Sequence, residues 1–158
     1  MKKLLTLCVI HQSPRVLLAM KKRGFGTGKW NGYGGKVKED ESILDATKRE
    51  LQEESGIIGN DFELLGILTF QFKDNLDELL EMHIFRLNSF QGEPQETEEM
   101  RPQWFSQGDI PYNEMWCADQ LWLPSFLEGK KFTGHFLYES HGSDIILEHK
   151  INFTDNLI

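Results

Sequence analysis

Three glutamates, Glu50, Glu53 and Glu54, are spaced so that a helix would present their carboxylates on one face. Like charges this close destabilise a helix unless something neutralises them. Carboxylate oxygens are the ligands that Mg²⁺ and Mn²⁺ prefer, and such ions bridge phosphate oxygens and make a bound water more nucleophilic. The spacing therefore indicates a candidate divalent-metal site that could act on a phosphate compound. The alternative is an ordinary solvated, glutamate-rich helix surface.

Arg49 and a glycine-rich loop accompany these carboxylates. Arg49 precedes Glu53 by four residues, so its guanidinium can hold that side chain in position, and Glu41 could receive the same arginine. The segment 24–35, GFGTGKWNGYGG, has six glycines in twelve residues. This density predicts irregular backbone that approaches a ligand closely, and the carbonyl of Gly35 is a further candidate metal ligand.

A helix must position the carboxylates, and the sequence predicts one over about 43–55. Ser42 is the candidate N-cap, Asp45 stands where a capping box has glutamate, and Gly56 is placed to end the helix. Opposite the glutamates runs a stripe that we expect in the core, made of Leu44, Thr47, Leu51 and Ile58.

Strands surround this helix. Apolar or alternating runs predict one hairpin from 4–10 and 15–20 and a second from 62–73 and 79–87. A short helix is predicted over 119–128, where Pro124 limits it to its first turn or kinks it. Further strands are expected at about 100–105, 131–138 and 145–153.

The composition is that of an ordinary globular protein. The chain has 158 residues, 39% hydrophobic and 27% charged, and lacks the run of about 20 apolar residues that a membrane helix needs. We expect a single domain over 1–158, and a short N-terminal apolar run that forms a strand instead of a signal peptide. The two cysteines, Cys8 and Cys117, indicate neither a disulfide framework nor a C-x-x-C site. We expect a cytoplasmic monomer without a membrane partner.

The charge distribution points to a small anionic substrate. A net charge of −8 argues against a stable nucleic-acid partner. Residues 1–38 hold nine of the 17 basic residues and no acidic one, whereas all 25 carboxylates come later. This division suits a polyanion bound between a basic segment and a carboxylate-held metal, although each lysine could simply be solvated.

The segment 35–57, GKVKEDESILDATKRELQEESGI, fits the pattern Gly-x5-Glu-x7-Arg-Glu-U-x-Glu-Glu-x-Gly-U, in which U is bulky and aliphatic. The segment resembles the signature box of the Nudix hydrolases. The resemblance implies an α/β fold in which a mixed β-sheet is sandwiched between α-helices in three layers, and Mg²⁺, or Mn²⁺, as the cofactor. It also implies that Glu50, Glu53 and Glu54 bind the metal with the carbonyl of Gly35, that Glu53 or Glu54 activates the attacking water, and that Arg49 supports them.

A further acidic ligand in this family usually comes from a loop beyond the box. In the segment 98–102, EEMRP, our choice is Glu99, with Glu98 as the alternative. An isolated glutamate in a loop could equally be a solvated surface residue.

The resemblance extends over nearly the whole chain to members of the family that hydrolyse oxidised purine nucleoside triphosphates, such as 8-oxo-dGTP or 2-hydroxy-dATP. It is carried by RVLLAMKKRGFGTGKWNGYGGKV, by EEMRPQWF and by the W-x-x-D-x-x-W segment at 116–122. It implies a nucleotide substrate whose base contacts Thr6, Phe25, Asn31, Trp116 and Asp119. Lys21 would lie near the sugar or phosphates, and Gly34 and Lys36 complete the expected substrate contacts.

The residue types suit a purine, since an amide offers a donor and an acceptor and an indole can stack on the base. Alternatively, Asn31 takes a left-handed turn conformation, and Trp116, Trp122 and Phe25 are core or lid aromatics. One position departs from the family pattern of two adjacent aspartates, because Ala118 stands in the place of the first. This chain therefore lacks one of the two carboxyls between which a proton could be exchanged.

Two other functions remain open. The same fold and metal could serve dinucleoside polyphosphates, nucleoside diphosphate sugars or capped RNA. A nucleotide-sensing module without catalysis is the third hypothesis, and the complete set of box carboxylates argues against it.

Overall fold

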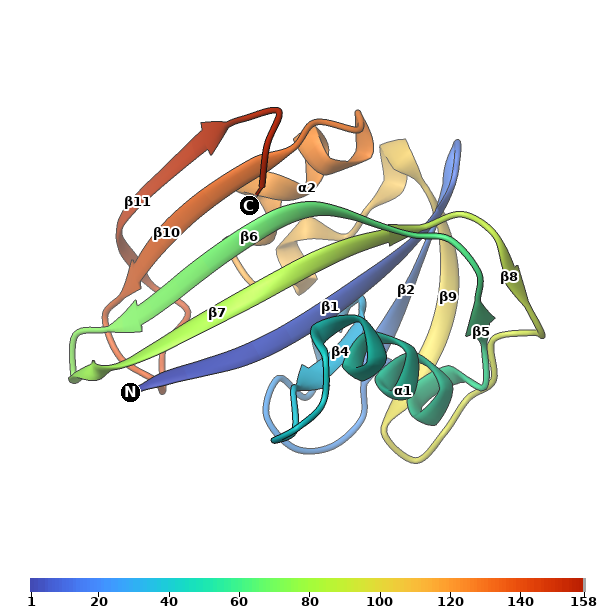
Figure 1. Cartoon of the computed structure of the whole chain (residues 1–158), viewed down its shortest axis with the longest axis horizontal. Coiled ribbons are helices and arrows are strands. Elements are labelled where there is room, and N and C mark those ends of the chain that lie inside the picture. The colour runs from blue at the N-terminus through green and yellow to red at the C-terminus, as the bar shows by residue number, and fades with distance from the viewer. Residues whose placement is uncertain (158) are drawn as a thin grey trace.

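A mixed β-sheet of nine strands forms the centre of the protein in the computed structural model, which describes residues 1–157 (Figure 1). The strand order is β11-β10-β6-β7-β1-β2-β3, with β4 paired to β1 and β9 paired to β2. These strands are β1 (Lys2–Gln12), β2 (Arg15–Lys21), β3 (Trp30–Asn31), β4 (Tyr33–Lys36), β6 (Phe62–Phe72), β7 (Asn75–Leu87), β9 (Met100–Ser106), β10 (Phe132–Tyr138) and β11 (Ile146–Phe153).

The remaining elements are two α-helices and several short segments. The helices are α1 (Ile43–Ser55) and α2 (Asp119–Leu127), a two-stranded sheet pairs β5 (Ile58–Gly59) with β8 (Phe90–Gln91), and 3-10 turns cover Gln107–Asp109 and Tyr112–Glu114. Neither helix is long and apolar enough to cross a bilayer, a finding that covers residues 1–157.

The predicted hairpins are confirmed. β1 pairs antiparallel with β2, and β6 pairs antiparallel with β7. The last two strands, β10 and β11, also pair antiparallel. Parallel pairing joins them into one sheet, since β1 lies parallel to β7 and β6 lies parallel to β10. Strands far apart in the chain thus become neighbours, and their side chains meet on a shared face.

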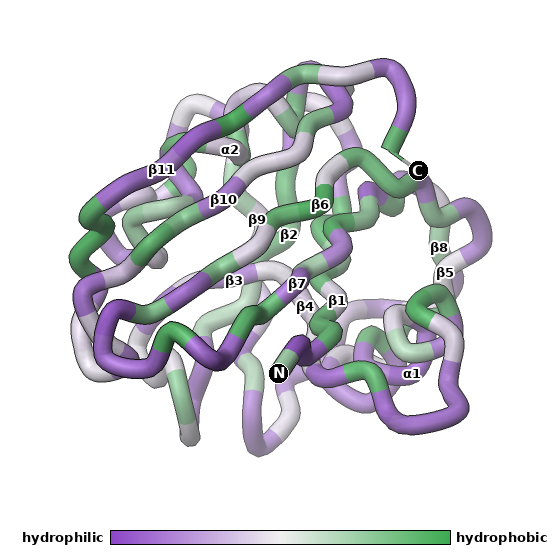
Figure 2. The backbone as a smooth tube through the Cα atoms, turned by 60° about the vertical axis from the view of Figure 1, so that its left-hand side comes forward, coloured by the Kyte–Doolittle hydropathy of each residue, from purple (hydrophilic) through white to green (hydrophobic). Residues whose placement is uncertain are grey.

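Both faces of the sheet are covered, as the alternation along β1 demonstrates. Leu7 belongs to the core that contains Trp122 of α2, whereas Cys8 belongs to the core that contains Leu51 of α1. In Figure 1, α1 lies in front of the strands and α2 behind them. Figure 2 shows hydrophobic and hydrophilic positions alternating along the strands. The predicted mixed sheet between helices is confirmed.

The predicted ends of α1 are confirmed. The Ser42 hydroxyl accepts a hydrogen bond from the Asp45 N–H at 3.0 Å, and Gly56 takes a left-handed conformation at φ 78°. The predicted core stripe is half right. Thr47 and Leu51 are buried, whereas Leu44 is 40% exposed and Ile58 is 51% exposed. Beyond the left-handed Gly56 the helical period no longer applies, so Ile57 enters the core in place of Ile58.

The prediction of irregular backbone throughout 24–35 is wrong in its second half, because β3 and β4 lie there. A Cβ atom on Gly34 would lie 1.9 Å from the carbonyl oxygen of Thr6, so only glycine allows β4 to pack this closely on β1. The first half is irregular, as expected, with Gly24, Gly26 and Gly28 at positive φ.

Helix α2 continues past Pro124 to Leu127, so the proline does not end it at the first turn. Asp119, the first residue of this helix, is buried.

Candidate active site

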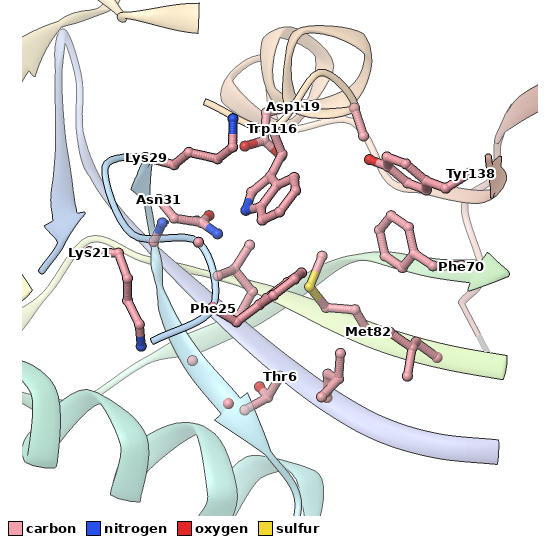
Figure 3. A pocket seen from close by; sticks show the side chains of 18 of the residues that line it. Thr6, Lys21, Phe25, Lys29, Asn31, Phe70, Met82, Trp116, Asp119 and Tyr138 are labelled. Carbon is pink, nitrogen blue, oxygen red and sulfur yellow. Dashed lines mark hydrogen bonds between the residues drawn. The ribbon is translucent and has the colours of Figure 1, made fainter. Parts of the chain in front are cut away.

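A cavity of about 280 Å³ lies between the sheet, the glycine-rich loop and the segment that precedes α2 (Figure 3). It brings together residues that are far apart in the sequence. The predicted site residues that line it are Thr6, Lys21, Phe25, Asn31, Gly34, Gly35, Glu54, Trp116 and Asp119. Five others lie outside its lining: Lys36, Arg49, Glu50, Glu53 and Glu99.

Glu54 marks one end of the cavity. It is 6% exposed, and one of its carboxylate oxygens accepts a hydrogen bond from the Gly34 N–H at 2.9 Å. Burial, together with the nearby charges of Glu50 and Glu99, raises the pKa of Glu54 to about 8, against the opposing effects of the Gly34 N–H and the charge of Lys21. This carboxyl therefore binds a proton or a cation more readily than an exposed glutamate does.

Arg49 holds several carboxylates in place beside that end, and it contacts both of the partners predicted for it, Glu53 and Glu41. It contacts Glu41 twice, at 2.7 and 3.0 Å, and it contacts Glu50 at 2.9 Å and Glu53 at 3.4 Å. A fifth hydrogen bond goes to the carbonyl of Lys36 at 3.1 Å. Hydrogen bonding to Arg49 lowers the pKa of Glu41 to about 2. Arg49 is thus a positioning residue, since it braces the start of the box against α1.

Gly35 and Glu50 fit together tightly. A Cβ atom on Gly35 would lie 2.6 Å from a carboxylate oxygen of Glu50, so glycine is required for this carboxylate to lie against β4. Burial raises the pKa of Glu50, and hydrogen bonding to Arg49 opposes this effect. Glu53 differs from both neighbours because its side chain is 57% exposed.

Glu99 faces the other carboxylates, which favours it over Glu98 as the additional acidic group. Its charge raises the pKa of both Glu50 and Glu54. Lys21 lies 3.6 Å from Glu99, whereas Glu98 has a side chain that is 84% exposed and contacts Arg23.

The oxygen-only character of this group fits a hard divalent cation. Glu50, Glu54 and Glu99 repel one another electrostatically, and a cation would relieve that repulsion. Within residues 1–157, no three carboxylate, imidazole or thiol groups lie close enough together to hold a metal ion as they stand. The carboxylates would therefore have to leave their present ion pairs with Arg49 and Lys21 in part to converge on one.

Aromatic side chains form the opposite end of the cavity. Phe25 stacks on Trp116 with ring centroids 5.1 Å apart, and the Lys29 ammonium lies 4.9 Å from the centroid of the indole (Figure 3). Asn31 accepts a hydrogen bond from the Gly32 N–H at 2.8 Å. The alternative of a left-handed Asn31 is wrong, because Asp40 is the only non-glycine residue at positive φ within 1–157.

Asp119 supplies the carboxyl of this aromatic end. Its Oδ1 accepts a hydrogen bond from the Trp122 indole N–H at 3.1 Å, whereas its Oδ2 is buried and has no hydrogen-bond partner among the described residues. Burial raises the pKa of Asp119 to about 7. Trp122 itself is 1% exposed, which agrees with the alternative of a core aromatic.

Sequence reasoning missed the apolar wall and Lys29. The wall consists of Leu5, Leu7, Phe70, Phe72, Leu80, Met82 and Tyr138. The hairpin of β6 and β7 was predicted, but the parallel pairings that join it to β1 and to β10 were not. Alternation along β6, β7 and β10 predicts which residues share a face, but not that these faces meet. Lys36, by contrast, is exposed at the end of β4 and does not line the cavity. The cavity therefore gives no support for the substrate contact expected of Lys36.

Comparison with known proteins agrees with this geometry. The family model described as NUDIX domain matches residues 1–126. An oxidized purine nucleoside triphosphate hydrolase from Danio rerio is 49% identical over 98% of this chain and 97% of its own length. The corresponding protein from Mus musculus is 46% identical over 98% and 97%.

Solved structures show the same architecture. The mutator MutT protein from Bacillus halodurans superposes with a TM-score of 0.83 at 25% identity, and the match covers 95% of this chain and 97% of that one. Nudix hydrolases generally use a divalent metal ion. The predicted resemblance is confirmed: the chain belongs to the Nudix family of hydrolases.

Proposed function

We propose that the protein hydrolyses oxidised purine nucleoside triphosphates, such as 8-oxo-dGTP or 2-hydroxy-dATP, to the monophosphate and pyrophosphate, and so removes them from the nucleotide pool. One observation carries the proposal: a single cavity joins an aromatic end at Trp116 and Asp119 to a carboxylate end at Glu54. The names of the zebrafish and mouse relatives support it.

The aromatic end has the groups that a purine requires. Trp116 and Phe25 offer ring faces on which a base can stack, and Asn31 offers an amide. The unpaired Oδ2 of Asp119 adds a polar atom at the same end, which a base edge could engage. Thr6 lies further toward the carboxylate end, and Lys21 is placed to approach the sugar or phosphates (Figure 3).

At the carboxylate end, Glu50, Glu53, Glu54 and Glu99, together with the carbonyl of Gly35, are the groups that would hold Mg²⁺, or Mn²⁺. When bound, such an ion neutralises phosphate charge and acidifies a water molecule. Arg49 keeps Glu50 and Glu53 oriented through its hydrogen bonds.

Glu54 is the better placed of the two candidates to orient or deprotonate the attacking water. Its carboxyl is buried in the cavity and fixed by the Gly34 N–H, whereas Glu53 is largely exposed and held by Arg49. A water held there would attack an internal phosphorus, since the base at Trp116 anchors the other end of the substrate. Pyrophosphate is then the leaving product.

The finer expectations belong to the same proposal. The chain is one domain that acts as a monomer in the cytoplasm on free nucleotides. The cavity of about 280 Å³ suits a nucleotide base and sugar better than a nucleic-acid strand.

Product analysis across a nucleotide panel tests this function. With excess Mg²⁺, oxidised purine triphosphates should be cleaved to monophosphate and pyrophosphate faster than normal purine triphosphates. Release of orthophosphate alone would contradict the proposal. A preference for dinucleoside polyphosphates, nucleoside diphosphate sugars or capped RNA would show that the substrate is not an oxidised purine triphosphate. Tight binding of nucleotides without turnover would identify a sensing module.

A further inference from the structure

Asp144, in the turn between β10 and β11, braces the backbone that carries the aromatic end of the cavity. Its two carboxylate oxygens accept hydrogen bonds from the Cys117 N–H at 3.2 and 3.0 Å, and Oδ1 also accepts from the Cys117 thiol at 3.0 Å. Cys117 directly follows Trp116 and lies two residues before Asp119. The position of both cavity residues therefore depends on a carboxylate that is far away in sequence.

Lys29 connects the same carboxylate to the glycine-rich loop. Its ammonium lies 3.6 Å from Oδ2 of Asp144 and 4.9 Å from the centroid of the Trp116 ring. Lys29 lines the cavity, and its side chain is 30% exposed, against 24% for Asp144. One partly buried ion pair thus joins three segments at the aromatic end.

Both charges act on Asp119, with opposite sign. Burial raises the pKa of Asp119 most and the Trp122 hydrogen bond lowers it; in addition, the charge of Asp144 raises it and the charge of Lys29 lowers it. The other groups that face Asp119 are the Trp122 indole, which donates to it, and the hydroxyls of Tyr112 and Tyr138, whose pKa values Asp119 raises.

We infer that Lys29 and Asp144 are a specificity-determining pair, which braces Trp116 and Asp119 and tunes whether Asp119 meets the base as a hydrogen-bond donor or as an acceptor. This inference rests on the proposed function. Protonated Asp119 can donate from its unpaired Oδ2, whereas ionised Asp119 only accepts, and oxidised guanine and oxidised adenine present different edges. Because Ala118 has no carboxyl, the second negative charge near Asp119 comes from Asp144, in the turn between β10 and β11.

The test uses charge-removing substitutions of nearly unchanged shape. Asp144→Asn keeps an acceptor for the Cys117 N–H, and Lys29→Gln keeps most of the aliphatic stem. A third variant, Lys29→Arg, keeps the positive charge. Asp61→Asn and Lys48→Gln, at exposed positions outside the cavity, are the matched controls.

Two measurements are needed. The first is the ¹³C-carboxyl NMR titration of Asp119 in the ligand-free protein, assigned with Asp119→Asn. The second is kcat/KM for oxidised guanine and oxidised adenine triphosphates between pH 5 and 9. Asp144→Asn should move the Asp119 titration down by about 0.5 to 1 pH unit, and Lys29→Gln should move it up by about as much. The pH at which the preference between the two bases changes should move in the same directions.

Lys29→Arg and both controls should leave these midpoints within about 0.2 pH unit of the wild type. Shifts of the same sign in Asp144→Asn and Lys29→Gln, or none, would overturn the inference. So would opposite NMR shifts with an unchanged base preference. Failure to hydrolyse either triphosphate would refute the proposed function instead, because the NMR titration requires no turnover.

Discussion

The two ends of the cavity each contain a buried carboxyl, but the neighbours of these groups differ. Glu54 receives a backbone N–H from Gly34 and stands near the like charges of Glu50 and Glu99, whereas Asp119 receives an indole N–H and stands among aromatic rings. Burial raises the pKa of both, to about 8 and about 7. The neighbours therefore decide the role: acidic neighbours favour a cation site, and aromatic neighbours favour recognition of a base.

The two ends also differ in how the chain builds them. Most of the carboxylate end comes from the continuous segment 35–57, with Glu99 as the distant addition. The aromatic end combines β1, β3, the glycine-rich loop and the segment before α2, and the turn before β11 braces it. Substitutions at the first end should abolish turnover, and substitutions at the second should change which base is accepted.

The largest effect is expected from removing charge at the carboxylate end. Glu54→Gln keeps the shape of the side chain and should lower kcat by at least about 10²-fold, because it removes the charge that the proposed function uses to activate water or bind metal. Glu53→Gln should also lower kcat, though less if Glu54 is the group that activates the water. Steady-state kinetics in excess Mg²⁺ measures both, with Asp61→Asn as the control. Near-normal rates in both variants would mean that the catalytic centre lies elsewhere.

A smaller effect is expected at the aromatic end. Asp119→Asn should cost about 1 to 3 kcal/mol in transition-state binding, or about 5- to 150-fold in kcat/KM, because a buried partner of the base is left mismatched. The loss should differ between oxidised guanine and oxidised adenine triphosphates. An equal loss for both, accompanied by a lower melting temperature, would show that Asp119 supports the fold through Trp122 and does not read the base.

The contrast explains how much the sequence could predict. The helix over 43–55, its Ser42 cap and the surroundings of Glu50 and Glu54 depend on spacing within 25 residues, so local rules suffice for them. The hairpins follow for the same reason. Leu44 and Ile58 were misjudged because burial depends on how α1 lies on the sheet, and the helical period alone does not specify that.

The rest depends on tertiary pairing. The parallel contacts of β1 with β7 and of β6 with β10 place Met82 and Tyr138 in the cavity wall, and no short-range pattern encodes them. The strands β3 and β4 were missed because six glycines usually prevent regular structure, whereas here the missing side chains allow β4 to approach β1. The base contacts proposed for Trp116 and Asp119 rest on the resemblance to a family, and no local pattern predicts them.

Ala118→Asp tests whether the number of carboxyls at the aromatic end sets the preference between the two oxidised bases. Ala118 lines the cavity beside Asp119 and is 2% exposed, so an aspartate there would place a second carboxyl next to the first. Two such groups can share a proton and suit both oxidised bases. We expect the ratio of kcat/KM for the two triphosphates to move several-fold, on the order of 3- to 10-fold, toward unity. An unchanged ratio would mean that residue 118 does not contact the base.

The smallest effect concerns the rim of the apolar wall, where His141 stacks on Phe72 at 3.9 Å and contacts Asp74 and Glu78, each at 3.0 Å. Hydrogen bonds to Glu78 and Asp74 raise the pKa of His141, and hydrogen bonds to His141 lower theirs. Because the folded pKa of the histidine is raised, its contribution to stability is complete below the unfolded value of about 6.5 and is lost as the pH rises through the folded value. The carboxylates contribute above their unfolded values of about 4 and lose that contribution as the pH falls through their lowered ones.

The contact should therefore stabilise the fold most between about pH 4.5 and 6.5. His141→Gln should lower Tm by about 1 to 2 °C at pH 5.5 and by less at pH 8.5, a small effect because the side chains of His141 and Asp74 are well exposed to solvent. Differential scanning calorimetry at the two pH values measures the change. The control Lys48→Gln should leave Tm unchanged from the wild type at each pH. If the deficit of His141→Gln were the same at both pH values, stacking on Phe72 would account for it and the charge of the imidazole would not, because stacking does not require the protonated ring.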